Sequence, residues 1–301
     1  AKPGLLRQHL TSVRAAKEVC GARVLGDEMG SSHVRFEPGK VKAGEYQFSI
    51  GTAGSTSLVC QTVLPALVLA DDKSRIRFSG GTHNGMSPSL SFLQYSYLPL
   101  LSILGVETSV TVERLGFFPA GGGCWQLEVA PAAALLPVEL VEPVSPRQCI
   151  AQALLSKLDR SIGERELNAA SRSLEGVLEV SGEVIQVETP GPGNSFLLRC
   201  QGAGNKPHES VFEETGQHGV SAERVAKRAS GRLKAFLHSG AVVEEHLADQ
   251  LLLWLVLAGG GCFTTTNPSQ HCRTNAAVIQ QMTGCEIEFR QQQRNRWLVS
   301  L

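Results

Sequence analysis

Hydrophobic and polar positions follow the same order in two separated stretches of the chain. The first stretch runs from about residue 51 to 113, and the second from about 244 to the C-terminus. In each, apolar residues at helical spacing precede a short segment of alternating apolar and polar residues, and this pair of patterns then recurs once. The first stretch predicts a helix over 58–69, a strand over 74–78, a helix over 89–104 and a strand over 108–113. The second predicts a helix over 247–258, a strand over 262–266, a helix over 273–282 and a strand over 286–289.

The opening segment, residues 1–43, fits the second half of the same unit. An amphipathic helix is followed there by strands near 22–24 and 33–36. We therefore predict three related βαβαββ units, of which the first is incomplete. The chain begins directly with the amphipathic segment, whose apolar face needs a partner, so we expect an N-terminal truncation.

The region between the second and third units has a different pattern. Proline and glycine mark both of its ends. It predicts a charged helix over 162–174, strands near 184–188 and 195–199, and a long helix over 221–238 that Ser221 caps. We therefore predict an α/β (α+β) protein, in which residues 1–146 and 241–301 form a large repeat domain and residues 147–240 a small inserted α/β domain.

The composition is that of a globular protein without net charge. With 28 basic and 28 acidic residues, the overall charge does not indicate a nucleic-acid-binding protein. Local binding of a nucleic-acid end is not excluded by this balance. Eight cysteines are scattered without a CxxC pair, which favours free thiols over disulfides or zinc. The sequence has neither a signal peptide nor an apolar run of about 18 residues, so we expect a cytoplasmic protein without membrane contact.

Two glycine-rich stretches are candidates for phosphate binding. The glycines at 121–123 lack the Gly-Lys-Ser/Thr ending of a P-loop, and a strand rather than a helix follows them. A turn between strands is the better interpretation, and the same holds for residues 191–194.

His271 has a more distinctive setting. It follows a Pro-Ser-Gln loop, at the start of a predicted helix and at the carboxyl end of a predicted strand. Such positions favour anions, because unpaired backbone N–H groups and the helix dipole point at the ligand. A neutral imidazole there could attack phosphorus and form a phosphoramidate. A histidine at a helix start is also an ordinary cap or loop residue, and that alternative stays open.

Other polar residues allow two interpretations in the same way. Asp249 lies near the start of the last apolar helix, where the helix dipole favours an acid in any case. Near a triphosphate the same carboxylate could hold Mg²⁺ or a ligand amine. His83 and Asn84, in the corresponding turn of the middle unit, are most simply turn formers.

Six stretches, in order along the chain, resemble the motifs of one enzyme family. They are residues 2–9, 51–55, 79–82, 118–123, 245–251 and 267–275, the last being Asn-Pro-Ser-Gln-His-Cys-Arg-Thr-Asn. The chain is identified by them as a member of the RNA 3'-terminal phosphate cyclase family, closer to the bacterial than to the animal branch. The resemblance implies a large domain of three βαβαββ repeats and a small thioredoxin-like domain inserted before the last repeat.

The resemblance also implies a reaction and its participants. ATP donates AMP to a histidine, AMP passes to an RNA 3'-phosphate, and the neighbouring 2'-OH closes a 2',3'-cyclic phosphate with the help of a divalent metal, Mg or Mn. By its position in the motif, His271 is the implied nucleophile. The implied nucleotide-binding residues are Gln61, Pro88, Phe92, His246, Leu247, Ala248, Asp249 and Gln250. The sequence does not identify metal ligands, the physiological RNA or the oligomeric state.

The sequence departs from the family pattern in two places. The position of His246 is commonly tyrosine, whose larger ring stacks on adenine with more area. The strand and Glu-Gly-Gly-Gly-Gln loop that open the family pattern are not in this sequence, so whether the chain completes the reaction is open. A non-catalytic relative that acts as an RNA-processing scaffold is the alternative, although such a relative is expected to lack His271. A sugar-type transferase built from the same units is a third hypothesis, and it would not need the Pro-Ser-Gln-His loop.

Overall fold

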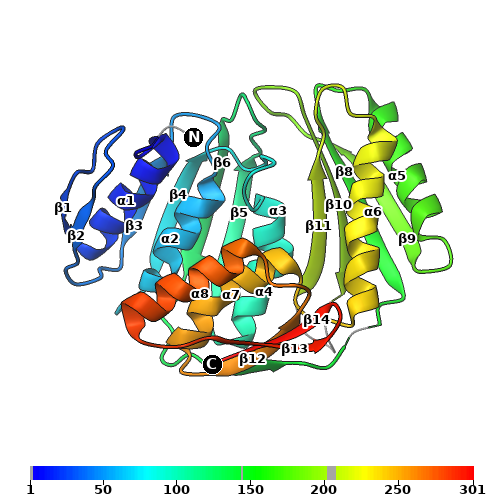
Figure 1. Cartoon of the computed structure of the whole chain (residues 1–301). Coiled ribbons are helices and arrows are strands. Elements are labelled where there is room, and N and C mark those ends of the chain that lie inside the picture. Colours follow the sequence, from blue (N-terminus) through cyan, green and yellow to red (C-terminus); the bar gives the residue numbers. More distant parts are fainter. Residues whose placement is uncertain (1–2, 144, 202–207) are drawn as a thin grey trace.

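The fold is a mixed α/β structure, as predicted. The computed structural model describes residues 3–143, 145–201 and 208–301, and within them the strands form three four-stranded sheets and one two-stranded sheet. Helices of the repeated units lie together between these sheets (Figure 1). A membrane-crossing helix is not found anywhere in the described ranges.

The middle unit has one parallel strand pair and a hairpin in the same sheet. Its elements are β3 (Glu45–Ser49), α2 (Thr56–Val68), β4 (Ser74–Gly80), a helical stretch of α3 (Leu90–Phe92), η1 (Leu93–Tyr97) and α4 (Leu98–Ile103), then β5 (Thr108–Arg114) and β6 (Gly123–Val129). The strand order is β3-β4-β6-β5. Strands β3 and β4 are parallel, whereas β6 is antiparallel to both of its neighbours.

The third unit repeats this topology. Its elements are β7 (Val138–Leu140), α7 (Glu245–Leu257), β12 (Gly261–Thr265), α8 (Gln270–Thr283), β13 (Glu288–Gln293) and β14 (Arg296–Ser300). The order β7-β12-β14-β13 has the same parallel first pair and the same antiparallel hairpin as the middle unit. The N-terminal elements α1 (Arg7–Cys20), β1 (Arg23–Leu25) and β2 (Arg35–Glu37) match the second half of this pattern.

The first strand of the third unit is split by the inserted segment. Strand β7 pairs with residues 261–263 of β12, and after the insertion Val243 pairs in parallel with Thr265, further along the same strand. In the middle unit, the corresponding bridge joins Ser55 to Gly81, directly before α2. The insertion therefore occupies the place of the short loop at residues 50–54 of the middle unit.

The inserted segment forms its own sheet, which we call the inserted sheet (β8 to β11). Its elements are β8 (Gln148–Ser156), α5 (Arg160–Leu174), β9 (Glu179–Gln186), β10 (Gly193–Gln201), β11 (Glu209–Thr215) and α6 (Ala222–Ser239). The order β11-β10-β8-β9, with β8 parallel to β9, agrees with the thioredoxin-like topology that the resemblance implied. Both helices lie on the outer side of this sheet in Figure 1, and they share a separate hydrophobic core with it.

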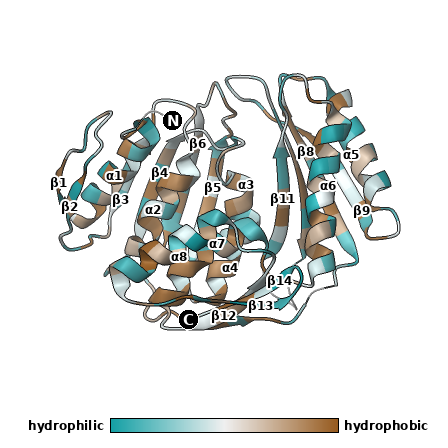
Figure 2. Cartoon of the chain, in the orientation of Figure 1, coloured by the Kyte–Doolittle hydropathy of each residue, from teal (hydrophilic) through white to brown (hydrophobic). Residues whose placement is uncertain are grey.

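The largest core lies among the repeated units. Helices α2 and α7 contribute many buried apolar residues to this core, and much of each is brown in Figure 2. Buried aromatic rings keep their polar atoms bonded there. The indole of Trp254 donates to the hydroxyl of Tyr97 at 2.8 Å, and that of Trp125 to Thr56 Oγ1 at 2.9 Å. The first bond joins α7 of the third unit to η1 of the middle unit, and the second joins β6 to α2 within the middle unit.

The predicted helices agree with the structure better than the predicted strands. Ser55, Ser221 and Ser269 cap α2, α6 and α8, each accepting a backbone N–H three residues further on. The predicted strand at 184–188 is the end of β9, and that at 286–289 lies at the start of β13. The pattern did not reveal β3, β7, β8, β11 or β14. The glycines at 121–123 form the predicted turn between β5 and β6, where Gly121 and Gly122 have positive φ.

Candidate functional site

His271 lies in the first turn of α8, just after the carboxyl end of β12. Ser269 is the N-cap, and its hydroxyl accepts the Cys272 N–H at 3.1 Å. The imidazole is exposed, while the neighbouring Cys272 side chain is fully buried and anchors the turn in the core. Burial and the nearby acids raise the pKa of the Cys272 thiol to about 12, so this thiol is a packing group and not a nucleophile.

The same face of α8 contacts α7 through one asparagine. Residues four apart lie on one helix face, so Asn275 is directly below His271. The Asn275 amide donates to the backbone oxygen of Asp249 at 2.9 Å and to its carboxylate at 3.1 Å. This pair of bonds fixes the half-buried carboxylate of Asp249 one helical turn away from the exposed imidazole.

The position of Asp249 on α7 differs from the expectation. Helix α7 begins at Glu245 and not near residue 247, because the buried carboxylate of Glu244 accepts the N–H groups of His246 and Leu247. The acid of the first turn is therefore Glu245, and Asp249 lies one turn further along. A first-turn dipole interaction does not account for Asp249. Burial raises the pKa of Glu244, against the opposing effect of nearby positive groups.

Gln61 and Gln250 meet although they come from different units. The Gln61 amide on α2 donates to Gln250 Oε1 on α7, and Gln250 in turn donates to the backbone oxygen of His246 at 3.0 Å. Both glutamines are half-buried, so one edge of each faces solvent. Three helices thus bring Gln61, Asp249, Gln250 and His271 to one region of the surface.

The remaining candidate residues have mixed exposure. His246 is exposed, whereas the side chains of Leu247 and Ala248 are buried in the core. A ligand can therefore contact these two side chains only after a local movement, or interact with them indirectly through neighbouring groups. Pro88 is half-buried and Phe92 buried, on either side of Ser89, the N-cap of α3. Their contact with a nucleotide stays a prediction.

Metal ligands do not cluster in the described residues. Within 3–143, 145–201 and 208–301, no three His, Cys, Asp or Glu side chains are arranged to hold a metal ion. Mg²⁺ commonly uses one or two carboxylates together with substrate phosphates, so a protein cage is not required. Asp249 is the carboxylate that would serve such a site.

Comparison with known proteins shows the family to which the sequence belongs. A profile of the family described as RNA 3'-terminal phosphate cyclase matches residues 1–289. The chain belongs to this family. It is 45% identical over 287 residues to the RNA 3'-terminal phosphate cyclase of Ectopseudomonas mendocina (strain ymp), covering 95% of this chain and 83% of that protein. It is 41% identical over 291 residues to that of Koribacter versatilis (strain Ellin345), covering 96% of this chain and 81% of the relative.

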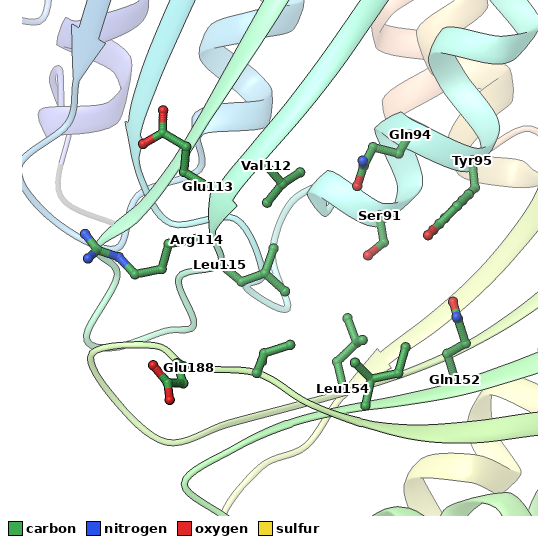
Figure 3. Close-up of a pocket in the computed structure, with 12 residues that line it drawn as sticks. Ser91, Gln94, Tyr95, Val112, Glu113, Arg114, Leu115, Gln152, Leu154 and Glu188 are labelled. Carbon is green, nitrogen blue, oxygen red and sulfur yellow. The ribbon is translucent and has the colours of Figure 1, made fainter.

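Clefts between the middle unit and the inserted sheet are separate from the surface region around His271. One of about 950 Å³ is lined by Gly54 and His83 on one side and by Glu166 on the other. Another, of about 460 Å³, is shown in Figure 3, where Gln94 and Tyr95 lie opposite Gln152 and Leu154 across the gap. Among the described residues that line these two clefts, His271 does not occur.

Three residues of this region were missed by sequence reasoning. Asn275 holds Asp249, Glu244 caps α7, and Arg232 of α6 donates to His246 at 3.4 Å. Asn275 lies within the last motif, four residues after His271, so helical spacing is a signal that could have found it. Arg232 is in the inserted segment, and nothing in its local sequence indicates its partner.

Proposed function

We propose that this chain uses ATP to convert an RNA 3'-phosphate end into a 2',3'-cyclic phosphate, through AMP bound covalently to His271. The observation that carries the proposal is the position of this exposed imidazole in the first turn of α8. It lies one turn from the Asn275–Asp249 contact, beside helices that bring Gln61 and Gln250 together. Membership of the cyclase family supports the same reaction.

The first step is nucleophilic attack by His271. An imidazole nitrogen forms a bond to the α-phosphorus of ATP, and the bond from that phosphorus to pyrophosphate breaks. The first N–H groups of α8 lack intrahelical acceptors by position, so they favour the charge that develops on the phosphoryl oxygens. The amides of Gln61 and Gln250 can both donate and accept, which suits the edge of adenine.

The later steps move AMP to the RNA end. An oxygen of the 3'-phosphate attacks the AMP phosphorus and the bond to His271 breaks, which gives the RNA phosphate a good leaving group. The 2'-OH then attacks the activated phosphate, AMP departs and the ring closes. The 2'-OH is already adjacent, so little entropy is lost on closure. This requirement accounts for RNA rather than DNA as the substrate.

A divalent cation, Mg²⁺ or Mn²⁺, fits the donor set. When bound, it neutralises charge on the departing pyrophosphate. Asp249 is the protein ligand that we assign, because its carboxylate is held in place by Asn275 and still has acceptor capacity.

We also propose a domain division and a location for the chain. Residues 147–240 form the inserted domain and the remainder forms the catalytic domain. This division is supported by the separate hydrophobic core that α5 and α6 share with the inserted sheet, although Leu154, Leu197 and Val211 of that sheet join the larger core. A cytoplasmic location is supported by eight free cysteines, six of which are buried.

The direct test is transfer of radiolabelled AMP from α-labelled ATP to the protein. We expect acid-labile labelling of the 301-residue chain that is lost in His271→Ala. His238→Ala is the matched control, since His238 is also exposed but lies in the last turn of α6. A chain that folds but takes up no label would contradict the proposal and favour the non-catalytic scaffold.

A further inference from the structure

The two segments expected to contact ATP are both tied to the inserted domain. One segment contains Pro88 and Phe92, in the middle unit, and the other runs from His246 to Gln250 in the third unit. Strand β11 is the edge of the inserted sheet, and Glu213 on it bonds to the first segment. Arg232 on α6 bonds to the second. The nucleotide segments therefore share a support that belongs to neither unit.

Glu213 holds the start of the first segment. Its carboxylate accepts the hydroxyl of Ser89 at one oxygen and that of Ser195, on β10, at the other. Its side chain is only 12% exposed, and such partly buried charge-assisted bonds are stronger than neutral ones at the surface. Ser89 also accepts the N–H of Phe92 at 3.0 Å. The carboxylate thus locks the turn from which Phe92 projects.

Arg232 holds the start of the second segment. Its guanidinium donates to the backbone oxygen of Glu213 and pairs with the carboxylate of Glu214 at 3.3 Å. Another arm of the same planar group donates to Nε2 of His246. Both contacts with β11 are made by Nη2, and the contact with His246 is made by Nη1. Because the guanidinium is planar and rigid, holding Nη2 on β11 limits the directions that Nη1 can take. The ring of His246 is oriented in this way by the inserted domain.

We propose that Glu213 and Arg232 are positioning residues for ATP, which hold the two nucleotide segments at a fixed separation before ATP binds. The proposal rests on the proposed function, since it takes both segments as parts of the nucleotide site. Neither residue is assigned a contact with ATP. Each acts through a neighbouring residue. Because the segments are already ordered, less conformational entropy is lost when ATP binds.

The test measures nucleotide binding separately from chemistry. A fluorescent ATP analogue is titrated into the full 301-residue chain and into Arg232→Ala, and the rate of AMP labelling is followed against ATP concentration. Losing one oriented hydrogen bond is expected to raise the dissociation constant and KM about fivefold, with kcat changed less than about twofold. Arg232→Lys keeps one donor but not the fork, so its values should lie between those of the wild type and Arg232→Ala. Glu213→Gln should raise both constants in the same direction.

Arg165→Ala is the matched control. Arg165 forms a bidentate pair with Glu223 at 2.7 and 2.9 Å, between α5 and α6 of the same domain, and none of its hydrogen bonds joins α3 or α7. We expect this variant to bind the analogue as the wild type does.

The other outcomes separate the two proposals. Unchanged binding in Arg232→Ala, or a loss of kcat at constant KM, would overturn the positioning role. Equal weakening in Arg165→Ala would overturn it as well, by revealing general loosening of the domain. A wild type that binds the analogue but takes up no label would contradict only the covalent step of the proposed function. If the wild type does not bind the analogue, both proposals fail.

Discussion

The middle and third units each place a histidine at the equivalent loop, His83 within it and His271 just after it, but in opposite environments. In both units this loop joins the second strand to the second helix and ends in a serine N-cap, Ser89 or Ser269. His83 in the middle unit is 1% exposed, whereas His271 in the third unit is exposed to solvent. The loop of the middle unit is longer, residues 81–89 against 266–269, and it lies against the inserted sheet.

The buried histidine is fully engaged in hydrogen bonds. His83 Nδ1 lies 2.8 Å from Thr82 Oγ1, its Nε2 lies 3.0 Å from Ser91 Oγ, and the Glu213 carboxylate lies 3.7 Å away. Both ring nitrogens of such an imidazole are engaged, so neither is free to attack phosphorus. The comparison teaches that a repeated fold supplies equivalent loops, and that the packing around each loop decides whether its histidine is accessible.

Replacing each of the two histidines by asparagine gives the largest expected difference between the two units. His271→Asn should remove AMP labelling and change the free energy of unfolding by less than about 0.5 kcal/mol, because the side chain is exposed. His83→Asn should retain labelling but lose about 2–3 kcal/mol of stability, because buried hydroxyl groups are left without partners. Urea unfolding and labelling at saturating ATP measure both effects. Loss of labelling in a folded His83→Asn protein would break the comparison.

The two serine caps give an intermediate effect. Ser269→Ala removes a cap and should cost about 1 kcal/mol of stability. Ser89→Ala removes a cap and also the donor to the Glu213 carboxylate, so it should cost about 2–3 kcal/mol. Each variant is the control for the other, and chemical denaturation of both measures the difference. Equal costs would mean that Glu213 does not stabilise this loop.

The smallest effect is a change in the pH dependence of stability. Burial lowers the pKa of His83 from its ordinary 6.5, with the charge of Glu213 opposing the shift. The unfolded chain then binds more protons than the folded chain, so the free energy of unfolding falls as the pH drops below 6.5. His83→Asn should lose this part of the slope, while His271→Asn should keep it.

The measurement is the difference between variant and wild type, determined by urea unfolding from pH 8 to pH 5. Other groups contribute with the opposite sign, which makes the difference necessary. Burial raises the pKa of Glu166 to about 7, so that residue favours the folded state as the pH falls from 7 towards 4.5. An unchanged slope in His83→Asn would show that the imidazole is not held neutral by burial.

Helices were predictable because their signals are local. The apolar spacing and the serine caps of α2, α6 and α8 lie within a few neighbouring residues, and the predicted bounds agree with the structure to within about three residues. Strands were less predictable. The three residues of β7 are too few to show alternation, and β13 is almost entirely exposed and polar.

The candidate site was predictable in its members but not in its contacts. His271, Asp249 and Gln61 were all named from the resemblance to the family. Their partners were not, since Gln61 and Gln250 are 189 positions apart and Arg232 reaches His246 from the inserted segment. Such pairings depend on how separate units pack, which no local pattern records.

The amino-acid sequence by itself determined the helices, the repeated unit, the family and the candidate nucleophile, because hydrophobic spacing, capping residues and ordered motifs are properties of neighbouring residues. Tertiary structure alone decided that His83 is buried and His271 exposed, that Asn275 orients Asp249, and that β11 and α6 of the inserted segment contact both segments that we propose to bind the nucleotide. Burial and long-range hydrogen bonds arise only when surfaces meet, and the energies that separate the two histidines come from those surfaces.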